Sequence, residues 1–264
     1  MKGWFVMITK ECLIDEIQPL MKEYLQGLTS PFDSFLEKHI LASTFFTIQD
    51  EMKEVGYYAI HNGQLLTQFY IRRSYQMHLQ KLFCQVLERH AVKSLFVPTC
   101  DELLLSLAID KDFTINKQAY FFQDSQTDIP VSDVLGVEIF RPAHQDDLQQ
   151  IQQICGDFLD QYERRIANEE IFTYYRGAVL LGIGVAKKSR LLEGLASIGM
   201  FTNEAYRKQG VGRTIILQLR KWCERHGIKP VSGCWYYNEA SKRTLESAGM
   251  VTKTRLLKID VIQV

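Results

Sequence analysis

The sequence lacks the features of membrane, secreted, zinc-binding and nucleic-acid-binding proteins. No apolar stretch reaches the roughly 18 residues of a membrane helix, and the short apolar run at 4–8 is followed by Lys10, Glu11 and Asp15, unlike a signal peptide. The six cysteines contain no CxxC pair, and the histidines show no ligand spacing. The 31 basic residues balance the 31 acidic ones, whereas a nucleic-acid-binding protein normally has a basic excess. We therefore expect a cytoplasmic protein with reduced thiols, no metal, and neither a membrane nor a nucleic acid as partner.

The composition is that of a folded globular protein with one or two domains. Of the 264 residues, 46% are hydrophobic and 23% are charged, which supports packed cores. The polar segment 123–133 has little apolar periodicity and contains Pro130, which interrupts regular structure. We therefore expect a linker there, between domains at 1–123 and 134–264.

The spacing of apolar residues predicts mainly strands early in the chain, beginning with a strand in 1–9, and an alternation of strands and helices later. In the second half the expected strands are 137–140, 179–187, 192–202, 230–236 and 251–264, and the expected helices are 146–160, 168–175, 211–225 and 238–248. Such an alternation indicates a mixed sheet with helices on both faces.

The two halves resemble each other when one is shifted by 136 residues. Segment 87–90 then matches 223–226, with Glu-Arg-His in common. The apolar positions of the preceding helix match as well: Leu79 with Ile215, Phe83 with Leu219, and Val86 with Trp222. In the first half a predicted strand at 94–97 and a short helix at 102–109 follow, as in the second half. We therefore expect two copies of one fold.

The segment 206–213 has the features of a phosphate-binding loop. It follows a predicted strand and opens a helix, whose first turn offers unpaired N–H groups and the positive end of the helix dipole. Gly210 and Gly212 allow a pyrophosphate to approach the backbone with no Cβ in the way. The positive charges around it are Arg207, Lys208 and Arg213. An ordinary loop with a solvated basic face is the alternative.

With these residues the chain resembles the GNAT superfamily of acyl-CoA-dependent N-acyltransferases. That family's signature is Arg or Gln, two residues, Gly, one residue, then Gly or Ala, which Arg207, Gly210 and Gly212 match. Segment 238–250 resembles the family's next motif, an Asn with small residues, a helix, and Gly before a hydrophobic residue. The resemblance covers 137–264. It implies a mixed α/β (α+β) fold of two GNAT-like units, each a mixed, mostly antiparallel twisted sheet flanked by helices.

The resemblance also implies an N-acetyltransferase that moves an acetyl group from acetyl-CoA to a primary amine of a small molecule or peptide by direct attack. The backbone at 209–213 would hold the pyrophosphate, and strand 200–202 would run beside the pantetheine and polarise the carbonyl with a backbone N–H. The expected cofactor-binding residues are Met200, Phe201, Thr202, Arg207, Lys208, Gln209, Gly210, Val211, Gly212, Arg213, Asn238 and Ser241. The oligomeric state stays open between a monomer and a homodimer.

The acid and the base of this reaction are less well defined. Many GNAT enzymes carry a Tyr as general acid seven residues after the motif's Asn, and here that position is Leu245. Tyr236 and Tyr237 lie just upstream and either donate the proton instead or pack as strand aromatics. Glu193 and Glu204 flank the cofactor strand, as candidate bases or as surface carboxylates. Because Leu245 cannot donate a proton, the alternative function is a non-catalytic GNAT-like module for CoA binding or interaction.

The first half departs from the signature. Ile71, Ser74 and Gln76 stand where the second half has the signature Arg and its two glycines. Their side chains would block the approach of a pyrophosphate to the backbone. We expect the first half to have kept the fold and lost the cofactor, so that one chain binds one acetyl-CoA. Replacing Gly212 by Gln is expected to abolish cofactor binding and to leave the protein folded.

Overall fold

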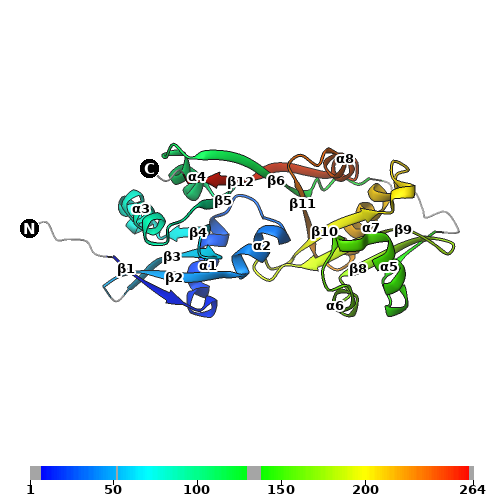
Figure 1. Cartoon of the computed structure of the whole chain (residues 1–264), viewed down its shortest axis with the longest axis horizontal. Helices are drawn as coiled ribbons and strands as arrows, with labels where there is room; N and C mark the ends of the chain where they lie inside the picture. The colour runs from blue at the N-terminus through cyan, green and yellow to red at the C-terminus, as the bar shows by residue number, and fades with distance from the viewer. Residues whose placement is uncertain (1–6, 52, 130–137, 262–264) are drawn as a thin grey trace, which may run out of the picture. The chain divides into compact units, whose positions relative to one another are not determined.

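The structure is a computed structural model that describes residues 7–51, 53–129 and 138–261. The chain forms two compact units (Figure 1). Unit 1 contains the chain up to Ala119 and again from Thr254, and unit 2 contains Tyr120–Lys253. Two long strands, β6 (Thr114–Asp124) and β12 (Met250–Asp260), therefore contribute one part to each unit.

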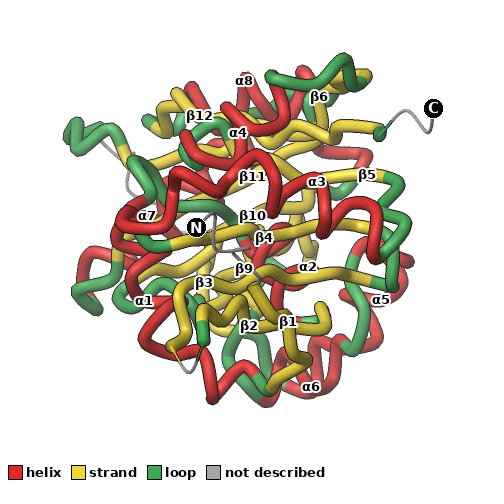
Figure 2. Tube along the Cα trace, turned by 90° about the vertical axis from the view of Figure 1, so that its left-hand side faces the viewer, coloured by secondary structure: helices red, strands yellow, loops and turns green. Residues whose placement is uncertain are grey.

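Unit 1 is a mixed sheet with helices on both faces. Its remaining elements are β1 (Met7–Cys12), α1 (Gln18–Gly27), α2 (Ser34–Leu41), β2 (Ser43–Asp50), β3 (Lys53–His61), β4 (Leu65–Ile71), α3 (Leu79–Arg89), β5 (Ser94–Pro98) and α4 (Glu102–Ile109). The strands lie in the order β1-β2-β3-β4-β5, followed by the end of β12. Neighbours are antiparallel except β4 and β5, which are parallel. Figure 2 shows the strands in yellow and the helices that cover them in red.

The two faces of the unit 1 sheet follow from the alternation of side chains along its strands. On one face, Tyr58 of β3 joins a buried cluster with Phe83 of α3 and Leu104 of α4. Its neighbour Tyr57 points to the opposite face, where its ring packs edge-on against Tyr24 of α1 at 6.1 Å. The apolar residues of four helices are thus buried against one sheet.

Unit 2 repeats this arrangement. Its elements are β7 (Glu138–Pro142), α5 (Leu148–Cys155), α6 (Tyr162–Ala167), β8 (Ile171–Arg176), β9 (Val179–Lys188), β10 (Leu195–Thr202), α7 (Val211–Arg225), β11 (Lys229–Trp235) and α8 (Glu239–Ser247). The strands lie in the order β6-β11-β10-β9-β8-β7, with the start of β12 beside β6. The parallel pair is β10 and β11, which corresponds to β4 and β5 of unit 1.

Helices α7 and α8 bury their apolar residues on one face of unit 2, and α5 and α6 bury theirs on the other. Two glycines of β9 allow α7 to lie close to the sheet. A Cβ on Gly182 or Gly184 would lie 3.0 Å from the side chain of Ile215. A glycine-interrupted apolar strand is therefore a requirement of helix packing at this place.

The mixed, mostly antiparallel architecture expected from the sequence is confirmed. The helix expected at 211–225 is present at these residues, and the short helix expected at 102–109 is present as well. None of the described helices is long and apolar enough to cross a membrane. The strand expected in 1–9 is present from Met7 onward, and residues 1–6 lie outside the described part.

The helix expected at 168–175 is wrong, because this segment is strand β8, and the helix precedes it as α6. Glu169 adopts a positive φ of 56°, which ends the helix. The β-branched and aromatic residues after it favour a strand, and β8 pairs with β7 and β9 on its two sides.

The limits of the two units also differ from the domains expected at 1–123 and 134–264. The end of β6 belongs to unit 2, and the end of β12 belongs to unit 1. The expected linker at 123–133 lies outside regular structure from Ser125 to Ile129, and its remainder from Pro130 is outside the described residues.

Candidate functional site

Strands β10 and β11 begin as parallel neighbours and then separate. Their paired residues are Leu195 with Lys229, Ala196 with Pro230, and Ser197 with Val231. Among the described residues the pairing ends there, although β10 continues to Thr202 and β11 to Trp235. The buried Ser232 hydroxyl donates to the Ile198 carbonyl at 2.7 Å, which ties the strands together where the gap opens.

The gap leaves one backbone edge of β10 without a neighbouring strand. Ile198 directs its carbonyl toward β11, so Met200 and Thr202 face the same way, because alternate residues of a strand bond to the same neighbour. Asn203 agrees with this alternation, since its N–H donates to Leu181 of β9 at 2.9 Å. The N–H of Met200 therefore faces the gap, which makes it a donor for a group bound between the strands.

The loop after β10 leads to the N-terminus of α7. The first intrahelical bond runs from the Thr214 N–H to the Gly210 carbonyl at 2.9 Å. The N–H groups of 211–213 precede this bond and have no partner within the helix. Lys208 and Gly210 adopt positive φ values of 61° and 82°, which turn the chain into the helix. Unpaired donors at the positive end of a helix dipole suit a bound anion.

The two signature glycines are required for different reasons. Gly210 has a positive φ, and a Cβ built on it meets nothing within 4 Å, so the loop borders open space there. A Cβ on Gly212 would lie 3.1 Å from both Thr202 Oγ1 and Thr244 Cγ2. Gly212 thus allows α7 to approach β10 and α8. We therefore expect Gly212→Gln to lower stability as well as binding, which revises the expectation from the sequence.

The three basic residues around the loop differ in their contacts. Arg207 forms an ion pair with Glu204 at 3.0 Å, and its guanidinium lies 6.0 Å from the centre of the Phe201 ring. Arg213 Nε donates to the carbonyl of the last residue of α8 at 2.9 Å. Lys208 is exposed and forms no ion pair within the described residues. Each of these three side chains retains N–H groups that can donate to a phosphate oxygen.

The N-terminus of α8 contains the other residues expected to bind cofactor. Asn238 caps this helix, because its Oδ1 accepts from the Ser241 N–H at 3.0 Å. The cap leaves the two N–H donors of the Asn238 side chain for another partner. Leu245 is 1% exposed and belongs to the core of unit 2, so this position lies in an apolar environment.

Two of the four candidate catalytic residues lie between β11 and α8. Tyr236 is half-buried and stacks on Tyr120, with ring centres 4.6 Å apart and planes at 8°. Tyr237 is 60% exposed and packs edge-on against Trp235 at 5.1 Å. Because β10 and β11 are parallel, their C-terminal ends lie on the same side of the sheet, so this turn and the loop after β10 lie at the same end of the strands. Tyr237 is the more accessible hydroxyl.

The two candidate bases lie at opposite ends of β10. Glu204 follows the strand, beside the loop, and is paired with Arg207. Glu193 lies in the turn before the strand. Eight residues of extended chain span about 25 Å, so the structure does not bring Glu193 together with the loop.

Unit 1 differs from unit 2 at the corresponding loop. After β4 the chain forms a 3-10 helix, η2 (Arg73–His78), and α3 begins only at Leu79. The first turn of α7 thus has no α-helical counterpart in unit 1. The strands β4 and β5 also separate after two pairs. The residue that caps the short helix of unit 1 differs in its contacts: the Tyr24 hydroxyl of α1 donates to the carboxylate of Asp101, the cap of α4, at 3.0 Å.

The sequence did not point to two residues of the site, Ser232 and Thr244, nor to the packing role of Thr202. Ser232 bridges the two strands, and Thr202 and Thr244 limit the space at Gly212. Thr202 was expected to line the cofactor, but its contact with α7 has no local sequence signal, because it joins elements far apart along the chain. No cluster of three or more metal-ligating side chains occurs among the residues that the structure describes.

Two units of one fold, each with a separated parallel strand pair and one with a glycine-lined helix start, define a tandem protein of the acyltransferase type. The family description "Acetyltransferase (GNAT) domain" matches residues 13–125, and "Acetyltransferase (GNAT) family" matches residues 137–250. The chain belongs to the GNAT acetyltransferase family and contains two GNAT domains in tandem. No protein with a curated description matches the chain by sequence.

Solved structures share this fold over the whole chain. An "acetyltransferase from GNAT family" of Colwellia psychrerythraea has a TM-score of 0.87 at 20% identity, covering 98% of this chain and 100% of that one. A GCN5-related N-acetyltransferase of Sphaerobacter thermophilus has a TM-score of 0.68 at 11% identity, with 96% and 94% covered. A "tandem GNAT protein from the clavulanic acid biosynthesis pathway" has a TM-score of 0.65 at 13% identity, with 97% and 98% covered.

Proposed function

We propose that the protein transfers an acetyl group from acetyl-CoA to a primary amine of a small molecule or peptide, with unit 2 as the catalytic unit. The observation that carries the proposal is the glycine-lined start of α7, which follows a strand with a free backbone edge. Open space in front of Gly210 fits a bound pyrophosphate, because a Cβ there meets no atom of the protein within 4 Å. Membership of the GNAT family supports the same activity.

In this proposal the chain's own groups bind and orient the reactants. The N–H groups of 209–213 hold the pyrophosphate, assisted by the charges of Arg207 and Lys208. The Met200 N–H polarises the carbonyl in the gap between β10 and β11, and Asn238 and Ser241 contact the pantetheine arm. Bound acetyl-CoA would supply an activated acetyl group that an amine can take up directly.

Proton transfer would use the groups at the ends of the two strands. Tyr237 would donate the proton to the leaving thiolate, because it is exposed while Tyr236 is stacked on Tyr120. Glu204 would accept the amine proton directly or through water. Glu193 is the weaker candidate for the base, because it precedes β10 instead of following it.

Isothermal titration with acetyl-CoA tests the proposal. The wild type should bind, and Gly210→Val should bind roughly a hundredfold more weakly, because a branched side chain enters the open space and strains a positive φ. Ser74→Val, the matched change in unit 1, should leave the affinity within about twofold. No binding by the wild type at millimolar acetyl-CoA would contradict the proposal.

A non-catalytic CoA-binding or interaction module is the second candidate. The observation that favours it is the burial of Leu245, which leaves no hydroxyl at the position of the general acid in many GNAT enzymes. Release of free CoA across a panel of polyamines, amino sugars and peptides distinguishes the two. Binding of acetyl-CoA without release for any acceptor would favour the module.

A further inference from the structure

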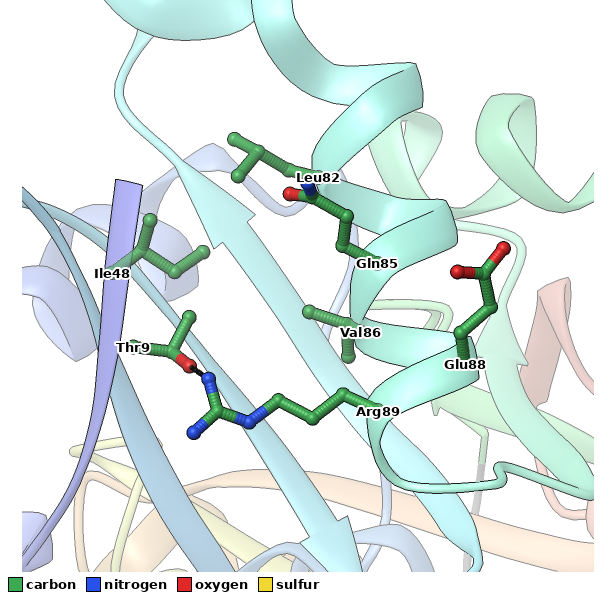
Figure 3. Close-up of a pocket in the computed structure, with 7 residues that line it drawn as sticks. All are labelled: Thr9, Ile48, Leu82, Gln85, Val86, Glu88 and Arg89. Atoms are coloured by element: carbon green, nitrogen blue, oxygen red, sulfur yellow. Dashed lines mark hydrogen bonds between the residues drawn. The ribbon is translucent and has the colours of Figure 1, made fainter. Parts of the chain in front are cut away.

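Unit 1 contains a partly open pocket of about 470 Å³ between α3 and the first two strands (Figure 3). Its buried side is apolar and consists of Ile48, Leu82 and Val86, each at most 5% exposed. The residues that border it on the more exposed side are Thr9, Gln85, Glu88 and Arg89. The pocket is separate from the proposed cofactor site, because every residue that lines it belongs to unit 1.

At the corresponding place in unit 2 the long helix has a tryptophan, Trp222, instead of a valine. Val86 lies three residues before Arg89, the end of α3, and Trp222 lies three residues before Arg225, the end of α7. The Trp222 ring is half-buried, packs against Phe172 of β8 at 5.3 Å and lies against the unit 2 core. The fold of unit 2 therefore accepts an indole between this helix and the second strand, whereas unit 1 has the smaller Val86 at the matched position.

The charge at the edge of the pocket points to the chemistry of a ligand. Arg89 donates to the Thr9 hydroxyl and has no ion-pair partner among the described residues. A guanidinium has five N–H donors, so most of them remain for another acceptor, best a carboxylate. In Figure 3 the Arg89 side chain extends toward Thr9, whereas the Glu88 side chain extends away from both residues.

We propose that this pocket binds a small aromatic carboxylate, with the ring against Val86 and the carboxylate on Arg89. The ring would occupy the space that the Trp222 side chain fills in unit 2. Burial of an aromatic ring against apolar side chains provides the affinity, and the bidentate pair with Arg89 fixes the orientation. This inference does not depend on the activity proposed for unit 2.

Isothermal titration of the full chain with indole-3-acetate tests the inference. We expect a Kd on the order of 100 µM, typical of a ligand of this size. The neutral indole-3-acetamide, of nearly the same shape, should bind roughly tenfold more weakly, because it lacks the charge that pairs with Arg89. Equal affinity for acid and amide, or no binding of either, would overturn the proposal.

Two variants locate the binding. Val86→Trp copies unit 2 and should remove indole-3-acetate binding while it raises the melting temperature and leaves acetyl-CoA affinity unchanged. Arg89→Gln, an exposed change that conserves the fold, should weaken indole-3-acetate roughly tenfold and leave the amide unaffected. Undiminished binding to both variants would overturn the proposal.

Discussion

Units 1 and 2 share one order of elements but differ at the loop between the fourth strand and the long helix. In unit 2 this loop contains Gly210 and runs into the first turn of α7. In unit 1 a 3-10 helix takes the place of that turn, and Tyr24 bonds to the cap of α4. Both units keep their buried clusters. The fold therefore depends on packing across the sheet, whereas the proposed cofactor binding would depend on a few backbone positions at one helix start.

The largest expected effect concerns this loop. One chain should bind one acetyl-CoA, because the described residues of unit 1 have no glycine at the positions that match Gly210 and Gly212. Gly212→Gln should abolish measurable binding and also cost about 1–2 kcal/mol of stability, since its side chain meets Thr202 and Thr244. Titration calorimetry and urea unfolding give both values. Gln76→Gly is the control and should change neither the acetyl-CoA affinity nor the stability. Binding of two acetyl-CoA molecules per chain would show that both units bind the cofactor.

The second prediction concerns the turn before the short helix, where unit 2 has Tyr236 and Tyr237 and unit 1 has Thr99 and Cys100. Tyr237→Phe should lower kcat about a hundredfold at unchanged acetyl-CoA affinity, because it removes the proposed proton donor. Tyr236→Phe should change kcat less than about threefold. A larger loss of kcat in Tyr236→Phe than in Tyr237→Phe would show that Tyr236 is the proton donor.

The third prediction concerns a buried carboxylate of unit 2. Burial acts to raise the pKa of Asp147, but hydrogen bonds from Arg141, the His144 N–H and Tyr175 lower it to about 2. This stabilisation is present above the unfolded pKa of 3.8 and is lost as the pH falls toward 2. Asp147→Asn should cost about 2 kcal/mol at pH 7 in urea unfolding. An equal cost at pH 2 would show that charge is not the cause.

The fourth prediction has the opposite sign in unit 1. Burial raises the pKa of Asp101 to about 6, despite bonds from the Leu104 N–H and Tyr24. The contribution of the Asp101 carboxyl group to the stability of the fold is fully present below pH 3.8, the unfolded pKa, and is lost as the pH rises through about 6. Asp101→Asn copies the Asn238 cap of unit 2. At pH 7.5 it should therefore raise the free energy of unfolding by about 1–2 kcal/mol, and the melting temperature with it. Below pH 4 the variant and the wild type should melt together; a loss of stability at pH 7.5 would contradict this account.

The smallest expected effect is at the far end of β10. Glu193→Gln should leave kcat/KM within about twofold, because the residue lies about 25 Å of extended chain away from the loop. Glu204→Gln, at the near end, is the matched comparison and should lower kcat/KM more. A greater loss at Glu193 would show that the amine enters from the start of the strand.

The helix start at the candidate site was predictable, because its signals are local. Glycines, an apolar helical repeat and basic residues within one short segment predicted α7 at its observed residues. The segment 168–175 was not predictable in this way. Its apolar residues fit a helix and a strand alike over so short a length, and pairing with β7 and β9 decided for the strand.

The sequence by itself determined that the chain contains two related halves and that only the second carries a glycine-rich loop before its long helix. These properties depend on residues that are close together along the chain. Only the tertiary structure decided that the end of β12 joins β5 of unit 1, that Gly212 is enclosed by Thr202 and Thr244, and that Val86 leaves a pocket. Each of these joins residues from separate elements, and such contacts arise when hydrophobic burial brings the elements together, which no local pattern records.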